Sequence, residues 1–160
     1  MSLLNPESES DVRRSLLDIL RGANHHAFAL ETRLLGTGAP DVNSADDRGE
    51  WWFECKYLKN LPQKFWLRDA PLRLTDQQMR PAQRVWHTKR WRAGNRRTYY
   101  FVVARNHLAT SSAALHWYLL PGGAAAENLG RTWTLSKLER VSQFYSVTCP
   151  TPEDLNQCLF

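Results

Sequence analysis

Cysteine is scarce in this sequence, and the few cysteines present do not suggest cross-links. Cys55, Cys149 and Cys158 are odd in number, far apart and without the Cys-x-x-Cys spacing of many zinc sites. The sequence therefore indicates neither a disulfide framework nor a zinc site. We expect a protein of the reducing cytoplasm.

Long apolar runs, internal repeats and low-complexity segments are also lacking. No stretch approaches the roughly 18 uninterrupted apolar residues that a membrane span needs, and the N-terminus is polar and acidic, unlike an export signal. The 160 residues, 42% of them hydrophobic, suffice for one hydrophobic core. We expect a single domain over residues 1–160, with no membrane partner.

Acidic residues are missing from a long internal stretch. None occurs between Asp76 and Glu127, although eight basic residues fall there, so this stretch carries +8 of a total net charge of +5 and the remainder carries −3. A basic region beside an acidic one indicates a polyanionic partner bound through its phosphates. An ordinary solvated basic helix explains the charges equally well. The basic residues are Arg80, Arg84, Lys89, Arg90, Arg92, Arg96, Arg97 and Arg105.

Turn signals and hydrophobic periodicity predict the order α-β-β-β-α-β-β-α, followed by a short final helix. The first helix is expected to have Asn5 as its N-cap, Pro6 at its first position and Gly22 as its end. The other helices are expected from Thr75 or Arg80 to Ala93, within 133–147 and from residue 151. Strands are expected at 27–34, from 41, at 51–58, 98–104 and 116–120, with a turn over 43–49 and a loop at 121–126.

This order predicts an α/β fold with a mixed central β-sheet flanked by helices. The segment Thr98–Ala104 is apolar on both faces, as expected of a central strand covered on both sides. In the strand 51–58, side chains alternate between the two faces of the sheet. Trp51, Phe53 and Cys55 are therefore expected on one face, and Trp52, Glu54 and Lys56 on the other.

Asp41 and Glu54, on neighbouring strands of this hairpin, are the candidate ligands of a metal ion. Magnesium prefers oxygen ligands and usually takes one or two carboxylates together with water and substrate phosphate. Lys56, on the same face as Glu54, is placed to orient or deprotonate an attacking water and to offset charge on a phosphate. The backbone carbonyl of Cys55 is a further candidate ligand, with its thiol packed behind the site. This set suits metal-dependent phosphodiester hydrolysis.

These residues resemble the motif of the PD-(D/E)xK nuclease superfamily, in which a Pro-Asp pair, a short hairpin and Glu-x-Lys follow one another. The matching pieces here are Pro40-Asp41, after a glycine-rich approach, and Glu54-Cys55-Lys56. The sequence is most similar to archaeal-type Holliday junction resolvases and VRR-NUC nucleases, which are often phage-encoded. Two further matches are Glu9 on the first helix and Gln83, which precedes an aromatic helix ending at Gly94. The likeness covers residues 9–105.

The resemblance implies a restriction-endonuclease-like sandwich and an Mg²⁺-dependent endodeoxyribonuclease, with Mn²⁺ as a substitute ion. It implies a homodimer that resolves four-way DNA junctions in recombination and repair, in the cytoplasm of a host if phage-encoded. The catalytic residues would be Asp41, Glu54, Lys56 and Gln83, and the metal ligands Glu9, Asp41, Glu54 and Cys55. The basic residues at 80, 84, 89, 90, 92, 96 and 97 would contact DNA. Residues 106–160 would complete the sheet and contribute to the dimer.

Several alternatives stay open from the sequence alone. Glu9 lies on the apolar stripe of the first helix, but a helix N-terminus also favours acidic residues, and Glu31 is a rival third carboxylate. Gln77 competes with Gln83. Trp86 is expected in the core, whereas Trp91 fits core or surface, and the adjacent His25 and His26 are expected in a loop.

The function has two alternatives of different kinds. A related endonuclease acting on flaps, forks or duplex DNA would share the same motif. A non-catalytic nucleic-acid-binding domain would share the basic helix, and its carboxylates would then be structural.

Overall fold

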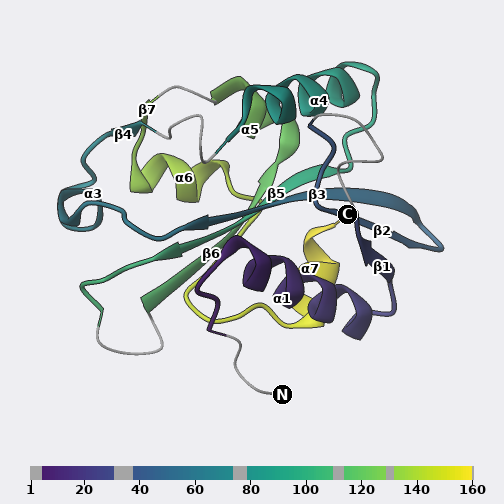
Figure 1. Ribbon diagram of the computed structural model, residues 1–160, viewed down its shortest axis with the longest axis horizontal. Helices are drawn as coiled ribbons and strands as arrows, with labels where there is room; N and C mark the ends of the chain where they lie inside the picture. The colour runs from purple at the N-terminus through teal and green to yellow at the C-terminus, as the bar shows by residue number, and fades with distance from the viewer. Residues whose placement is uncertain (1–4, 31–37, 74–78, 110–113, 129–131, 160) are drawn as a thin grey trace.

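The computed structural model describes residues 5–30, 38–73, 79–109, 114–128 and 132–159. Its centre is a six-stranded sheet in the order β1-β2-β3-β5-β6-β8 (Figure 1). β3 and β5 are parallel and the other neighbouring pairs are antiparallel, which confirms the predicted mixed sheet. The strands are β1 (His26–Ala29), β2 (Val42–Asp46), β3 (Gly49–Leu58), β5 (Thr98–Arg105), β6 (Leu115–Pro121) and β8 (Phe144–Ser146).

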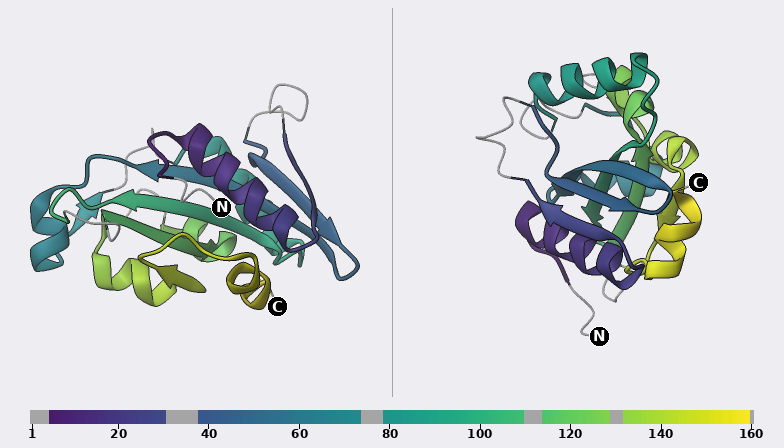
Figure 2. Two further views of the ribbon diagram at one scale, coloured as in Figure 1. Left: turned by 90° about the horizontal axis from the view of Figure 1, so that it is seen from below. Right: turned by 90° about the vertical axis from the view of Figure 1, so that its right-hand side faces the viewer.

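Helices cover both faces of this sheet, so the predicted α/β sandwich is confirmed (Figures 1 and 2). One face carries α1 (Glu9–Gly22) and α7 (Pro152–Cys158). The opposite face carries α4 (Pro81–Arg92), α5 (Gly122–Asn128) and α6 (Leu135–Val141). The remaining elements are α3 (Gln63–Arg68) and a small sheet of β4 (Leu72–Arg73) and β7 (Thr132–Trp133). Among the helices so described, none is long and apolar enough to cross a membrane.

Two hydrophobic cores follow from the alternation of strand side chains. Trp51, Phe53 and Cys55 are fully buried in the cluster that contains the apolar side of α1. Tyr100 and Val102 of β5 point the other way, into the cluster beneath α5 and α6. The prediction that Trp51, Phe53 and Cys55 share one face of β3 is therefore confirmed. β5 is buried along nearly its whole length between β3 and β6, as a central strand must be.

The first helix begins later than predicted. Its N-cap is Ser8, whose hydroxyl accepts the backbone N–H of Asp11 at 3.2 Å. The Asp11 carboxylate in turn accepts the Ser8 hydroxyl at 2.8 Å. This local pair satisfies the first turn, so the prediction of Asn5 as N-cap and Pro6 as first helical residue is wrong. Of the two starts considered for α4, the later one is correct, since Arg80 is the N-cap and the helix begins at Pro81. Thr151 caps α7 as predicted.

The β2–β3 turn is shorter than predicted, because β2 continues to Asp46 and only Asp47 and Arg48 connect the strands. Residues 133–147, predicted as one helix, form the short helix α6 followed by the edge strand β8. The adjacent histidines also differ from the prediction. His25 is buried and its ring contacts Ser44 at 2.9 Å, while His26 opens β1. The predicted strand at 27–34 ends at Ala29 as far as it is described.

The Gly/Ala-rich run predicted as a loop is the helix α5. A Cβ atom at Gly122 would lie 2.4 Å from the Thr98 hydroxyl oxygen, and one at Gly123 would lie 2.4 Å from the Trp91 ring. The two glycines therefore let α5 approach β5 and α4 more closely than any other residue would allow. Small residues act here as a packing surface, a role that composition alone does not distinguish from a loop.

Candidate active site

Asp41 lies where β2 and β3 separate. The pairing between these strands ends at Val42 and Phe53. Two residues further along β3, the backbone N–H of Cys55 donates to the Asp41 carboxylate at 2.8 Å. Gly38, with a φ of +91°, brings the preceding chain so close to α4 that a Cβ atom there would lie 2.3 Å from the Ala82 carbonyl oxygen. Glycine is therefore required at this approach.

Glu54 and Lys56 project from the same face of β3, as the sequence predicts. Both are buried, with exposed fractions of 0% and 3%. The Lys56 Nζ atom lies 2.8 Å from Glu54 Oε1 and 3.6 Å from Glu9 Oε1. Lys56 therefore joins the carboxylate on its own strand to the one on α1.

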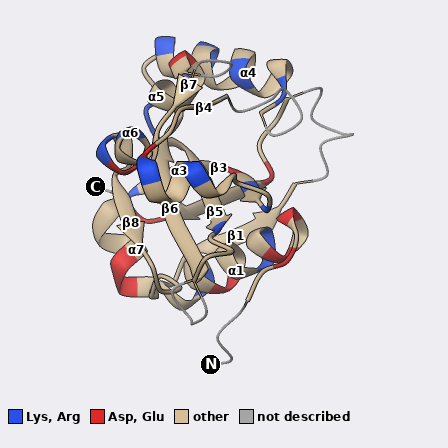
Figure 3. Ribbon diagram, turned by 90° about the vertical axis from the view of Figure 1, so that its left-hand side faces the viewer, with Lys and Arg blue, Asp and Glu red and all other residues tan. Residues whose placement is uncertain are grey.

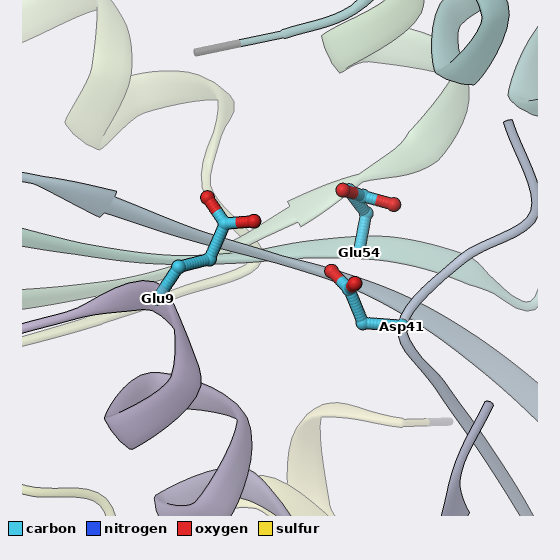
Figure 4. A group of neighbouring side chains, drawn as sticks. All are labelled: Glu9, Asp41 and Glu54. Atoms are coloured by element: carbon cyan, nitrogen blue, oxygen red, sulfur yellow. The ribbon is translucent and has the colours of Figure 1, made fainter. Parts of the chain in front are cut away.

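Glu9 is the first residue of α1, and its side chain reaches the same point as Asp41 and Glu54 (Figure 4). One carboxylate oxygen from each of the three residues lies within 4.8 Å of the others. The Glu9 side chain is 48% exposed, so the site is open on the side of α1. Glu9 thus occupies a helix N-terminus and also faces the cluster, and its role as a metal ligand stays a prediction. Glu31 lies outside the described residues.

Gln83 fixes the orientation of Glu54 from the opposite element. Its amide nitrogen donates to Glu54 Oε1, and its amide oxygen accepts the backbone N–H of Arg80 at 3.0 Å. The same side chain thus caps α4 and holds a carboxylate of the cluster. The sequence predicted a site role for Gln83, and the structure brings it to the site; Gln77 lies outside the described residues.

The pKa values of Glu54 and Glu9 are raised because both side chains are buried to some extent beside Asp41. Burial and the nearby Asp41 charge raise the pKa of Glu54 well above its usual value. Burial and Asp41 also raise the pKa of Glu9, although Lys56 opposes the shift. Burial by itself would lower the pKa of Lys56, but Glu54 and Glu9 raise it, so Lys56 is an ammonium ion at neutral pH. Three carboxylates thus share one buried cation.

This cluster fits a divalent metal ion. All three side chains offer the oxygen donors that Mg²⁺ and Mn²⁺ accept. The second carboxylate oxygen of Glu54 is buried without a hydrogen-bond partner among the described residues, as expected of a ligand whose partner is an ion. The Cys55 thiol packs in the core behind the site, and burial raises its pKa, so it is no ligand. A role for the Cys55 carbonyl stays a prediction.

The predicted DNA-binding residues differ in their exposure and in their contacts with the rest of the fold. Figure 3 shows basic residues along α4. This helix begins beside the carboxylates, where Gln83 contacts Glu54. Arg97 instead supports the fold, since it lies 5.0 Å from the Trp51 ring and donates to the Arg48 carbonyl at 2.6 Å. Arg96 packs on Trp91. The exposed basic residues are Arg80, Arg84, Lys89, Arg92, Arg96 and Arg97, whereas Arg90 is half-buried.

Two tryptophans near the site were read incompletely from the sequence. Trp86, predicted in the core, is half-buried and packs on Trp52 with ring centroids 5.6 Å apart. Trp52 was predicted on the face of Glu54 but given no role. The strand period places it there, and only the packing of α4 over β3 reveals that Trp86 meets it.

No family model and no curated protein sequence matches this chain. Among solved structures, the chain is similar to Archaeoglobus fulgidus Hjc, described as a Holliday junction resolvase from an archaeal hyperthermophile. The similarity covers 91% of this chain and 97% of that chain, with a TM-score of 0.44 and 14% sequence identity. A likeness this distant transfers no residue role, so the site has to be interpreted from its own geometry.

Proposed function

We propose that this protein is a divalent-metal-dependent endodeoxyribonuclease of the PD-(D/E)xK superfamily. One observation carries the proposal: carboxylates from α1, the start of β2 and β3 converge within 4.8 Å of one another, with the buried Lys56 ammonium among them. Gathering so many charges at one partly buried point is costly for a structural role, since carboxylates repel. A bound metal cation would offset the repulsion between the carboxylates, and Lys56 would offset the charge of a phosphate.

In the proposed site, Glu9, Asp41 and Glu54 hold the metal ion, with the Cys55 carbonyl as a further ligand. When bound, a divalent ion neutralises charge on the phosphate and lowers the pKa of a bound water. Gln83 keeps Glu54 in place. Because Lys56 is protonated, we assign it to orienting the attacking water and offsetting phosphate charge, and not to removing a proton.

The substrate we propose is branched DNA, specifically a four-way junction. The exposed basic residues of α4 extend from the carboxylate cluster along one side of the molecule, and the sequence has no acidic residue from 77 to 126 to compete with phosphates. Two symmetric incisions in a junction need two active sites, which a homodimer with twofold symmetry supplies. We propose that the last third of the chain, which adds β6 and β8 to the sheet, contributes to that dimer. Recombination and repair are the processes this activity would serve.

A cleavage panel tests the proposal. Labelled junction, fork, flap, duplex and single-stranded DNA are incubated with Mg²⁺, with Mn²⁺ and with EDTA. We expect metal-dependent cutting that is fastest on the junction. Glu54→Ala and Lys56→Ala should each lower the cleavage rate by about 10²-fold or more while the junction still shifts in a gel. Lys59→Ala is the matched control, because Lys59 is exposed just beyond β3.

Two results would redirect the assignment. Faster cutting of flaps, forks or duplex would keep the nuclease and replace the junction as its substrate. An intact panel with either ion, together with a normal gel shift, would favour the non-catalytic nucleic-acid-binding domain.

A further inference from the structure

Arg90 of α4 is held by two tryptophans. Its guanidinium carbon lies 5.0 Å from the centroid of Trp52 and 5.0 Å from that of Trp86. The two rings are inclined at 54° to each other and come from different elements, β3 and α4. A planar guanidinium favours the faces of aromatic rings, and contact with both restricts its position. Arg90 is therefore a fixed cation, unlike the exposed arginines of the same helix.

This cation has no anionic partner in the part of the chain that the structure describes. No carboxylate forms an ion pair with Arg90, and no acceptor oxygen takes a hydrogen bond from its guanidinium. Burying a charge in part without a counter-ion is unfavourable, and contact with aromatic rings offsets only part of that cost. The N–H groups not turned toward the rings are free to bind an anion from outside the chain.

The position of Arg90 relative to the carboxylates follows from helix and strand geometry. Arg90 is seven residues after Gln83, so both lie on one side of α4, about 10 Å apart along the helix axis. Trp52 is two residues before Glu54 on the same face of β3, about 7 Å away along the strand. Gln83 contacts Glu54 at one end of this interval, and Arg90 contacts Trp52 at the other. On this geometry the guanidinium is displaced from the carboxylates by roughly 7–10 Å along β3 and α4, which is on the scale of the distance between neighbouring phosphates of one DNA strand.

We infer that Arg90 binds the DNA phosphate next to the one that is cleaved, with Trp52 and Trp86 as positioning residues. The inference rests on the proposed nuclease function for the identity of the cleaved phosphate. It selects one residue from the basic set of α4 as the anchor of the DNA strand. The exposed arginines of the helix supply screened surface charge, which contributes much less per residue.

Binding measurements compare Arg90 with its matched control Arg92, which is exposed on the same helix. A fluorescent four-way junction is titrated in Ca²⁺, used to support binding without cleavage. Arg90→Ala should weaken binding about 10- to 100-fold, as for loss of a hydrogen bond to a charged group, and Arg92→Ala about 3-fold or less. Arg90→Lys should recover little, because an ammonium group lacks the planar contact with both rings.

A second arm locates the phosphate. Single methylphosphonates, which are neutral, replace the phosphates on either side of the cleavage point in the substrate. Wild-type cleavage should fall about 10-fold or more at one flanking position, and Arg90→Ala should show no further loss there. Arg92→Ala should keep the wild-type sensitivity. Thermal unfolding of each variant shows that it is folded, and Arg90→Gln replaces Arg90→Ala if the alanine variant does not fold.

The outcomes separate the two proposals. Equal effects of Arg90→Ala and Arg92→Ala, or methylphosphonate sensitivity retained in Arg90→Ala, would overturn the assignment of Arg90 while wild-type cleavage still supports the nuclease. Selective loss of binding in Arg90→Ala without any cleavage by the wild type would overturn the nuclease and leave Arg90 as a phosphate contact.

Discussion

Replacing Asp41 by asparagine should abolish metal binding and yet stabilise the metal-free protein. Asparagine keeps an oxygen that can accept the Cys55 N–H, so the link between β2 and β3 survives. It removes the negative charge that raises the pKa of both Glu54 and Glu9. The substitution therefore relieves repulsion inside the cluster without breaking its backbone contact.

The size of the effect follows from the spacing of the carboxylates. Two unit charges at the 4.8 Å limit of the cluster repel by about 3 kcal/mol at an effective dielectric constant near 20. Attraction between Asp41 and Lys56 offsets much of this, and Glu54 and Glu9 escape part of it by taking up protons. We expect a net stabilisation of about 1 kcal/mol at neutral pH, within the range that single stabilising substitutions commonly give. For a domain of this size, that raises the midpoint of thermal unfolding by about 2–4 °C.

The stabilisation of the metal-free protein by Asp41→Asn should fade as the pH falls. The folded-state pKa values of Glu54 and Glu9 lie above their unfolded values. The stability these two groups contribute is thus fully present below the unfolded pKa and is lost as pH rises through the folded pKa. Asp41 has little to repel when both are protonated, so the advantage of Asp41→Asn should shrink as pH falls.

Thermal unfolding in EDTA and in Mg²⁺ is the assay. Mg²⁺ should raise the unfolding midpoint of the wild type, because it binds the folded state, and should leave that of Asp41→Asn unchanged. Asp47→Asn is the matched control, since Asp47 lies in the β2–β3 turn with its side chain 93% exposed. A lower midpoint for Asp41→Asn than for wild type in EDTA would refute the electrostatic reasoning. A retained Mg²⁺ shift would remove Asp41 from the metal site.

Two further predictions concern metal binding and packing. Because the pKa values of Glu54 and Glu9 are raised, protons compete with the ion, so Mg²⁺ affinity should increase with pH and binding should release protons. Calorimetry in buffers of different ionisation enthalpy measures that release, and a buffer-independent heat would contradict it. Gly123→Val should destabilise the fold by about 1–3 kcal/mol in urea unfolding, since its Cβ would overlap the Trp91 ring. The same change at Gly94, where nothing lies within 4 Å, isolates the cost of a positive φ.

The sequence predicted most of the site because its central relation is local. Strand side chains alternate with a period of two, so Glu54 and Lys56 had to share a face once β3 was recognised. The periodicity of α1 likewise placed Glu9 on the side that meets the sheet. Asp41 reaches the other two carboxylates because β2 and β3 separate at this residue. The sequence indicates this position of Asp41 only through the resemblance of its Pro-Asp pair to a known motif.

The errors arose where distant contacts decide the local structure. Residues 122–126 have the composition of a loop, yet they belong to a helix whose two leading glycines pack against Thr98 and Trp91, where a Cβ atom would not fit. Trp86 is expected in the core from its hydrophobicity, but its ring packs on Trp52 and stays half-buried. These contacting residues are distant in sequence from the positions they affect, so no local sequence pattern predicts the contacts.

One helix connects the chemistry of this site with its proposed grip on DNA. In the first turn of α4, Ala82 lies close to the backbone of Gly38, and Gln83 donates a hydrogen bond to Glu54. Both contacts therefore fix the start of this helix at the site. Nearly two turns later, Arg90 rests on Trp52 of the strand that carries Glu54. A shift of α4 along β3 would therefore move the carboxylate and the phosphate contact together. In the proposed complex, the side-chain contacts between α4 and β3 would set the spacing between the cleaved and the anchored phosphate.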